Sequence, residues 1–364
     1  MTTSRRLLAT AGMAFLAACG ADGNLPGVEA DELESNFVCV AGFAQGELFA
    51  AGARGAIPAL NNPGIIGAHA PFMVDDDRIL GVVINGEPRA YPFGILWWHE
   101  LVNDHVGGVD ILVSYCPLTG SGIVFDPTVD GEKRDFVVSG LLYRSNLVMS
   151  DELGEGLWNQ MLLGSQCGMD RGKELGRLPV VETTWGDWKT RYPATTIINM
   201  FTGYTDRPYF QYPYGNYDVA ENDFVDFLAE GATWRRDFET KELVLGVFDG
   251  PDAIAYPLET LADKGVSHIV NDQVGSTPFV VVSRSEWNTA QAFDRRMGGQ
   301  TLTFTMTSPA PFSMTDDQTG SEWDGRGEAV SGPLAGERLT PVADSYTAFW
   351  FAWALFYPNI VLFE

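Results

Sequence analysis

The sequence predicts an α+β protein built from two copies of one unit. Two stretches of the 364-residue chain recur in the same order: residues 78–92 reappear at 243–257 (243 − 78 = 165), and residues 102–115 reappear at 270–283 (270 − 102 = 168). Each copy contains short stretches of alternating apolar and polar residues, separated by turn sequences, and few helical patterns. Short strands with a minority of helices are typical of the α+β class, and ordered self-similarity indicates duplication.

The strand signals of the first copy begin with a hairpin. Residues 81–92 hold alternating apolar positions around Asn85-Gly86, a dipeptide that favours a tight two-residue turn. Further strands are expected at 110–115, 122–126, 135–140 and 195–200, with a turn at 129–133.

Two helices are expected in this copy. Residues 93–104 place apolar side chains at helical spacing, and residues 183–192 form a tryptophan-bearing segment that Pro193 ends. The same tryptophan pattern returns near the C-terminus, where Trp350 corresponds to Trp185. The predicted organisation is a signal peptide (1–18), a lead-in (19–74), a first repeat (75–205), an aromatic connector (206–240) and a degenerate second repeat (241–364).

The charge balance argues against nucleic acid as a partner. Twenty-three Lys and Arg residues stand against forty-eight Asp and Glu residues, which gives a net charge of −25. Such a chain repels phosphate backbones and anionic lipid surfaces. The acidic residues are scattered except at 75–77, which favours a solvated acidic surface over a dedicated cation-binding face.

The N-terminal residues have the pattern of a bacterial lipoprotein signal. Arg5 and Arg6 precede a short apolar core, and small residues precede Cys19. We expect Cys19 to become the lipid-bearing first residue of the mature protein, with an ordinary cleaved signal peptide as the alternative. The predicted location is the bacterial cell envelope, facing the periplasm, and Gly20 favours the outer membrane by resemblance to known sorting patterns.

One copy carries reactive residues that the other lacks. At the offset of 168, Cys116 corresponds to Arg284 and His99 corresponds to Ser267. Residues that the fold requires would be retained in both copies, so this pair is the candidate functional site. Drift around a buried thiol and a buried histidine is the structural alternative.

Three interpretations of the pair remain open. In the first, Cys116 and His99 bind a soft metal, copper slightly favoured over zinc, with Met149 or Cys167 completing the ligand set. In the second, Cys116 is the nucleophile of a thiol enzyme and His99 is its base. In the third, the pair is inert and the chain is a binding or scaffold lipoprotein.

The cysteine count limits the disulfides. After export, Cys39, Cys116 and Cys167 would remain in an oxidising compartment, so at most one bond forms among them. Cys167 could pair with Cys116, or with Cys39 while Cys116 stays free, and the sequence does not choose.

Several ordered motifs resemble those of a known family. Residues 84–92, 97–126, 139–151 and 178–193 together resemble the bacterial and archaeal family called domain of unknown function 3179. The resemblance covers roughly residues 75–200, and it implies an exported or membrane-anchored protein. The family pattern often reads Cys-Pro-Leu-Cys-Gly, whereas here Thr119 takes the place of the second cysteine. This departure implies that a dithiol cycle within the turn is lost, and it also permits a member without an active site.

Overall fold

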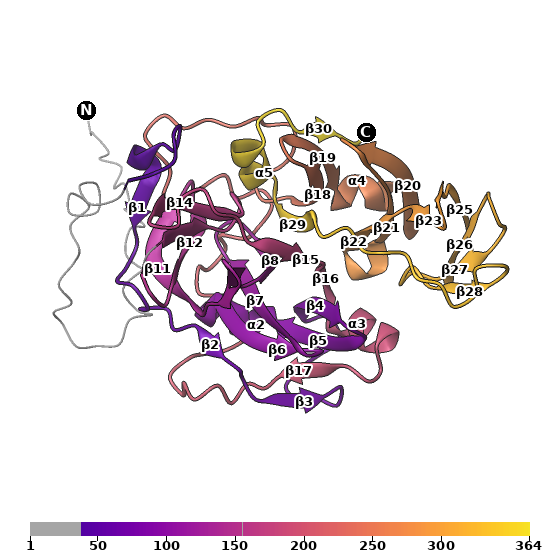
Figure 1. Cartoon of the computed structure of the whole chain (residues 1–364), viewed down its shortest axis with the longest axis horizontal. Helices are drawn as coiled ribbons and strands as arrows, with labels where there is room; N and C mark the ends of the chain where they lie inside the picture. The colour runs from indigo at the N-terminus through magenta and orange to yellow at the C-terminus, as the bar shows by residue number, and fades with distance from the viewer. Residues whose placement is uncertain (1–37, 155) are drawn as a thin grey trace, which may run out of the picture.

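The computed structural model describes residues 38–154 and 156–364 (Figure 1). The predicted signal peptide and the predicted lipid-bearing Cys19 lie outside the described residues. Within those ranges, every helix is too short or too polar to cross a membrane.

Strands dominate the described chain, so the predicted α+β class is wrong and the protein is mostly β. None of the four α-helices in the described ranges exceeds seven residues. They are α2 (Phe93–His99), α3 (Trp185–Arg191), α4 (Leu258–Asp263) and α5 (Trp350–Phe356), with short 3-10 turns η1 (Gln45–Glu47) and η2 (Ser285–Trp287).

The helix predicted over residues 93–104 shows the physical reason for the error. Helix α2 ends at His99, and Glu100 adopts a left-handed conformation with φ of 56° that an α-helix cannot continue. The chain then enters strand β6, which pairs with β7. Residues with apolar side chains at helical spacing therefore belong to a helix and then to a mostly buried strand, in which His105 is exposed.

The first half of the described chain forms three five-stranded sheets and a two-stranded ribbon. The first sheet has the order β1 (Leu48–Ala50), β11 (Phe136–Tyr143), β12 (Asn146–Asp151), β13 (Gly156–Asn159) and β14 (Gly164–Gly168). The second is β15 (Gly176–Leu178), β8 (Ser121–Asp126), β7 (Val109–Cys116), β6 (Leu101–Val106) and β2 (Leu60–Asn61). The third is β16 (Val181–Thr184), β4 (Arg78–Ile84), β5 (Glu87–Pro92), β17 (Thr196–Ile198) and β3 (Ile65–Gly67), and the ribbon is β9 (Thr128–Val129) with β10 (Glu132–Lys133).

The second half presents its strands in a similar succession. One sheet has the order β29 (Ser345–Phe349), β18 (Leu243–Asp249), β19 (Asp252–Pro257) and β30 (Val361–Leu362). A second contains β20 (Ser267–Val274), β21 (Thr277–Arg284) and β22 (Thr289–Asp294), followed by the ribbon β23 (Arg296–Met297) and β24 (Gln300–Thr301). The last, at the right of Figure 1, contains β25 (Phe304–Pro309), β26 (Phe312–Asp316), β27 (Glu322–Trp323) and β28 (Ala329–Ser331).

Side-chain contacts recur between the two halves at the offsets found in the sequence. Each half buries a tyrosine bonded to an aspartate, an indole bonded to an aspartate, and a tryptophan packed on a glycine. These contacts are Tyr91–Asp104 and Tyr256–Asp272 (2.7 Å each), Trp158–Asp151 (3.3 Å) and Trp323–Asp316 (2.9 Å), and Trp188 on Gly81 and Trp353 on Gly246. The recurrence supports the proposed division into repeats 75–205 and 241–364.

The two halves share one hydrophobic core. Its largest cluster combines Phe125 and Trp158 from the first half with Val244 and Trp353 from the second. Strand β8 lies against β29, and the corresponding strands β22 and β16 lie against each other. Each half thus covers a sheet that the other would leave exposed, and the turn after β7 lies inside the contact.

We predict that Gly81→Ala lowers the free energy of unfolding by about 1–3 kcal/mol. A Cβ at Gly81 would lie 2.4 Å from a ring carbon of the buried Trp188, so the ring would have to leave its packed position. Gly46→Ala is the control, because nothing lies within 4 Å of its added Cβ. Equal urea midpoints for the two variants would contradict this account of the packing.

Candidate functional site

Cys116 lies at the end of β7, immediately before the turn that leads into β8. Its side chain is buried, with 1% of the residue exposed. The turn closes through Gly120, which has a φ of 59° and whose added Cβ would lie 2.8 Å from the ring of Phe349 in the second half. A glycine is therefore needed at this position both for its conformation and for the close approach of β29.

A network of buried hydroxyl and amide groups holds this turn. Asn146 Nδ2 donates to Thr119 Oγ1 at 2.9 Å and to Gln160 Oε1 at 2.8 Å. Ser121 Oγ donates to the same Gln160 oxygen at 2.6 Å, and Gln160 Nε2 donates to Ser114 Oγ at 2.9 Å. Because these side chains bond one another inside the protein, the turn is fixed without the help of solvent.

The network belongs to the first half alone. At the offset of 168, Thr119 corresponds to Trp287 and Ser114 corresponds to Val282, neither of which can take the same place in it. The difference between the halves therefore extends beyond Cys116 to the side chains that position its turn.

Cys116 holds its proton in the described state. Its sulfur lies 3.7 Å from the carbonyl oxygen of Ser145, which accepts from the thiol. Burial raises the pKa of Cys116 to about 11, and the nearby charge of Glu100 adds to this effect, while Thr119 opposes it by hydrogen bonding. Burial and the charge of a carboxyl group thus outweigh the lowering of the thiol pKa by the turn residue Thr119.

Glu100 is the site residue that the sequence analysis missed. It follows helix α2, is 6% exposed, and lies close enough to Cys116 and Tyr214 to influence both pKa values. Burial raises the pKa of Glu100 to about 8, so the carboxyl group is mostly protonated at neutral pH. The signal was present: at the offset of 168, Glu100 corresponds to His268, so it differs between the halves as Cys116 does.

His99 directly precedes Glu100 in the sequence and is also buried, but its ring contacts other groups. Its Nδ1 lies 2.7 Å from the carbonyl oxygen of Pro58, and its Nε2 lies 2.6 Å from the hydroxyl of Tyr209. Burial lowers the pKa of His99 to about 4, so the ring is neutral, donates from Nδ1 and accepts at Nε2. Both ring nitrogens are occupied, and neither contacts Cys116.

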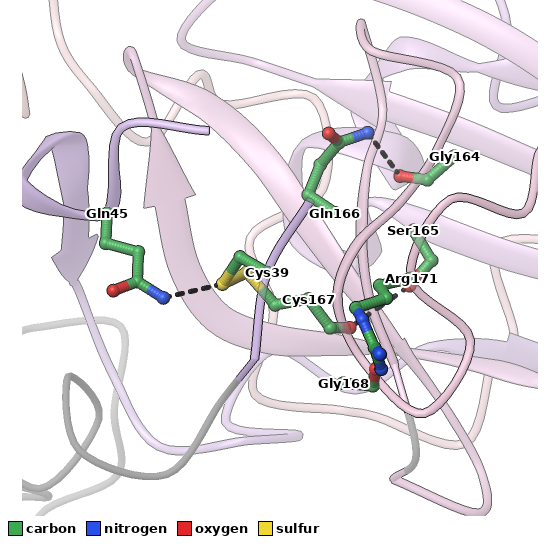
Figure 2. Close-up of a disulfide and its surroundings, with 8 residues drawn as sticks. All are labelled: Cys39, Gln45, Gly164, Ser165, Gln166, Cys167, Gly168 and Arg171. Carbon is green, nitrogen blue, oxygen red and sulfur yellow. Dashed lines mark hydrogen bonds between the residues drawn. A yellow bond between two sulfur atoms is a disulfide. The ribbon is translucent and has the colours of Figure 1, made fainter. Parts of the chain in front are cut away.

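The other two predicted metal ligands, Met149 and Cys167, also make contacts away from Cys116. Met149 is fully buried in β12, where it lies opposite Trp158. Cys167 forms a disulfide with Cys39, which ties the N-terminal lead-in to β14 (Figure 2). Of the two pairings that the sequence left open, the structure has this one, and Cys116 is the free cysteine among residues 38–154 and 156–364.

The described residues bring together no metal site of the predicted kind. Within residues 38–154 and 156–364, no group of three or more His, Cys, Asp and Glu side chains is arranged to hold a metal ion. The predicted set of Cys116, His99, Met149 and Cys167 is thus dispersed, and Glu100 is the ionisable side chain whose charge raises the pKa of the thiol.

Two further hydroxyl groups are buried in the same part of the protein. They belong to Ser145, whose carbonyl oxygen accepts from the Cys116 thiol, and to Tyr217, whose pKa is influenced by Cys116 and by a hydrogen bond to Ser145. Neither hydroxyl has a further partner of good geometry. Ser145 and its neighbour Arg144 both have positive φ, at 65° and 51°, in the turn between β11 and β12. Buried polar groups without partners and left-handed non-glycine residues are both costly, and they concentrate at functional sites.

The connector covers this site. The hydroxyl of Tyr212 donates to the carbonyl oxygen of Pro117 at 3.0 Å, and Ser145 N donates to the carbonyl oxygen of Phe227 at 3.1 Å. Lys241, 2% exposed, lies 4.3 Å from the ring centre of Tyr217. It also donates to carbonyl oxygens of the connector, including that of Phe224 at 2.7 Å. Residues 199–242 contain no helix or strand, so these contacts hold the cover in place.

The fold and site define a mostly β protein with a buried cysteine and carboxyl pair in its first half. The family described as Protein of unknown function (DUF3179) matches residues 54–360, and the chain belongs to it. The match confirms the family resemblance, including its weaker continuation through the second copy, and covers both halves. No curated protein and no solved structure matches the chain.

We predict that Glu100→Gln changes how stability depends on pH. Because the pKa of Glu100 rises from 4.5 to about 8 on folding, its contribution is complete below pH 4.5 and is lost as the pH rises toward 8. The free energy of unfolding of the wild type should fall relative to the variant by up to about 1.4 kcal/mol per pH unit in this window.

Urea titrations at several pH values measure this difference. Glu132→Gln, at an exposed position, is the control and should run parallel to the wild type. Parallel curves for the wild type and Glu100→Gln would show that Glu100 is not protonated in the folded protein.

Proposed function

We propose that this chain is a lipid-anchored envelope protein whose first half carries a thiol site for acyl transfer. The lipoprotein signal pattern that ends at Cys19 supports a lipid anchor and a periplasm-facing location, and Gly20 supports the preference for the outer membrane. The Cys39–Cys167 disulfide supports export, because structural disulfides form in oxidising compartments.

The observation that carries the proposed chemistry is the backbone hydrogen bond from Tyr115 N to the carbonyl oxygen of Glu100 at 2.8 Å, which holds Glu100 next to the strand end that carries Cys116, together with the effect of the Glu100 charge on the pKa of that thiol. In this proposal the Cys116 proton moves to ionised Glu100, and the sulfur forms a bond to a substrate carbonyl carbon. The carbonyl π pair moves to oxygen, where the hydroxyls of Ser145 and Tyr217 donate hydrogen bonds. That pair then re-forms the carbonyl, the bond to the alcohol or thiol part of the substrate breaks, and Glu100 gives its proton to this leaving group. The acyl group stays on Cys116 as a thioester until water attacks it, Glu100 takes a proton from that water, and the acid leaves as the thiol re-forms. A carboxyl pKa of about 8 suits a proton acceptor near neutral pH.

Glu100 replaces His99 as the base in this account. His99 bonds Pro58 and Tyr209, so it acts as a link between the lead-in and the connector. The substrate class is an activated acyl compound, an ester or thioester, which reaches the sulfur when the connector residues over Cys116 move aside.

The soft-metal interpretation has lost much of its ligand set. Cys167 is oxidised to a disulfide and both nitrogens of His99 are hydrogen-bonded, which leaves Cys116 with oxygen donors. Copper and zinc sites built on cysteine ordinarily add imidazole or further sulfur. Copper or zinc found by elemental analysis and lost in Cys116→Ser would restore this interpretation.

We predict that the full-length protein in detergent releases about one equivalent of p-nitrophenolate from p-nitrophenyl acetate in a burst. Cys116→Ser should abolish the burst, and Glu100→Gln should slow it by roughly 100-fold because the proton acceptor is lost. Glu132→Gln serves as the matched control at an exposed carboxylate.

Two results would contradict the proposal. A burst that persists in Cys116→Ser would place the chemistry elsewhere. Absence of both the burst and iodoacetamide labelling of Cys116 in the folded protein would favour the inert scaffold interpretation.

A further inference from the structure

A cavity lies between the two halves of the protein, and none of the site residues around Cys116 lines it. Its volume is about 570 Å³. Strands β4 and β16 and helix α3 contribute one side, and β22 with residues 326–341 contributes the other. A volume of this size suits a small organic molecule.

The lining combines apolar walls with one kind of charge. Trp188, Phe293 and Leu339 provide apolar surface, and Arg326 and Arg338 are the charged residues that line the space. No Asp or Glu lines it, although the chain contains forty-eight acidic and twenty-three basic residues. The side chains that line the cavity therefore carry positive charge only, and the acids paired with them, Asp324 and Glu328, lie outside the lining.

The arginines are anchored by acids that stay outside the lining. Arg326 Nε donates to Asp324 at 2.7 Å, and Arg338 Nη2 lies 2.7 Å from Glu328. Arg326 Nη1 also donates to the carbonyl oxygen of Arg191 at 3.3 Å. These contacts hold the guanidinium groups in place while leaving the remaining N–H groups of Arg338 for another acceptor.

A third guanidinium group, that of Arg191, adds positive charge near the cavity wall. Arg191 is 8% exposed, and its Nη1 donates to the lining residue Gln291 at 3.4 Å. Burial raises the pKa of the lining residue Tyr192, and the charges of Arg191, Arg326 and Arg338 oppose that rise. Three cations thus lie near one phenol hydroxyl at the edge of the cavity.

We propose that this cavity binds a small organic carboxylate with a flat apolar body. The guanidinium groups of Arg326 and Arg338 bind the carboxylate, since guanidinium presents paired N–H donors that match two carboxylate oxygens. The rings of Trp188 and Phe293 contact the apolar body. Because both halves supply the walls, binding holds them together.

Isothermal titration calorimetry of the full-length protein with 2-naphthoate tests the proposal, with 2-naphthalenemethanol as the neutral probe of similar shape. We expect one saturable site for 2-naphthoate and at least tenfold weaker binding of the alcohol. Arg326→Gln and Arg338→Gln should each weaken 2-naphthoate binding about tenfold. Arg296→Gln should leave it unchanged, because Arg296 pairs with Asp294 outside the lining.

A cavity-filling variant, Val83→Trp, tests the same site without changing an arginine, so the test still stands if an arginine variant misfolds. Near-ultraviolet circular dichroism identifies the variants that keep the native fold, and a folded Val83→Trp should lose 2-naphthoate binding. Equal binding of the acid and the alcohol would overturn the proposal. So would binding unchanged in Arg326→Gln, Arg338→Gln and Val83→Trp together, or no binding by the wild type.

Discussion

The packing of the turn after Cys116 against the second half is the constraint on which the site depends. Phe349 N donates to the carbonyl oxygen of Thr119 at 2.8 Å, so strand β29 covers a turn that would otherwise bond water. Once covered, the polar groups of the turn must find partners inside the protein, which Asn146 and Gln160 provide. The same exclusion of water raises the pKa values of Cys116 and Glu100. The exclusion of water by strand β29 therefore accounts for the internal hydrogen bonds of the turn and for the raised pKa values of the site.

The two halves share structural contacts but differ at the positions of the candidate site residues. Paired tyrosine and aspartate, indole and aspartate, and tryptophan on glycine recur in both, because they fix strands and fill the cores. Cys116 and Glu100 occur in the first half, where the second has Arg284 and His268. Arg284 instead pairs with Asp187 across the contact between halves at 2.6 Å. The second half thus uses the corresponding position for assembly, and the first uses it for the thiol.

The sequence was sufficient to predict the hairpins and several strands, because these depend on local turn chemistry. Comparison of the two copies selected Cys116 as a candidate, and its role stays a prediction. The prediction of the α+β class was wrong. Residues 93–104 have the spacing of one helix, but their last part belongs to strand Leu101–Val106. Comparison of the copies selected His99 because the second copy has Ser267 at that position, and Glu100 was not considered. The left-handed turn at Glu100 separates these neighbours, and nothing local to either residue reveals it. The disulfide partner of Cys167 likewise depends on a pairing across 128 residues.

The measurement that tests the account most directly is the pH titration of the Glu100 side-chain carboxyl by carbon-13 NMR, assigned by its loss in Glu100→Gln. The account predicts a midpoint near 8, because burial beside Cys116 favours the protonated form. A midpoint near the ordinary value of 4.5 would show a solvated carboxylate, and it would contradict both the closed site and the proposed role of Glu100 as proton acceptor.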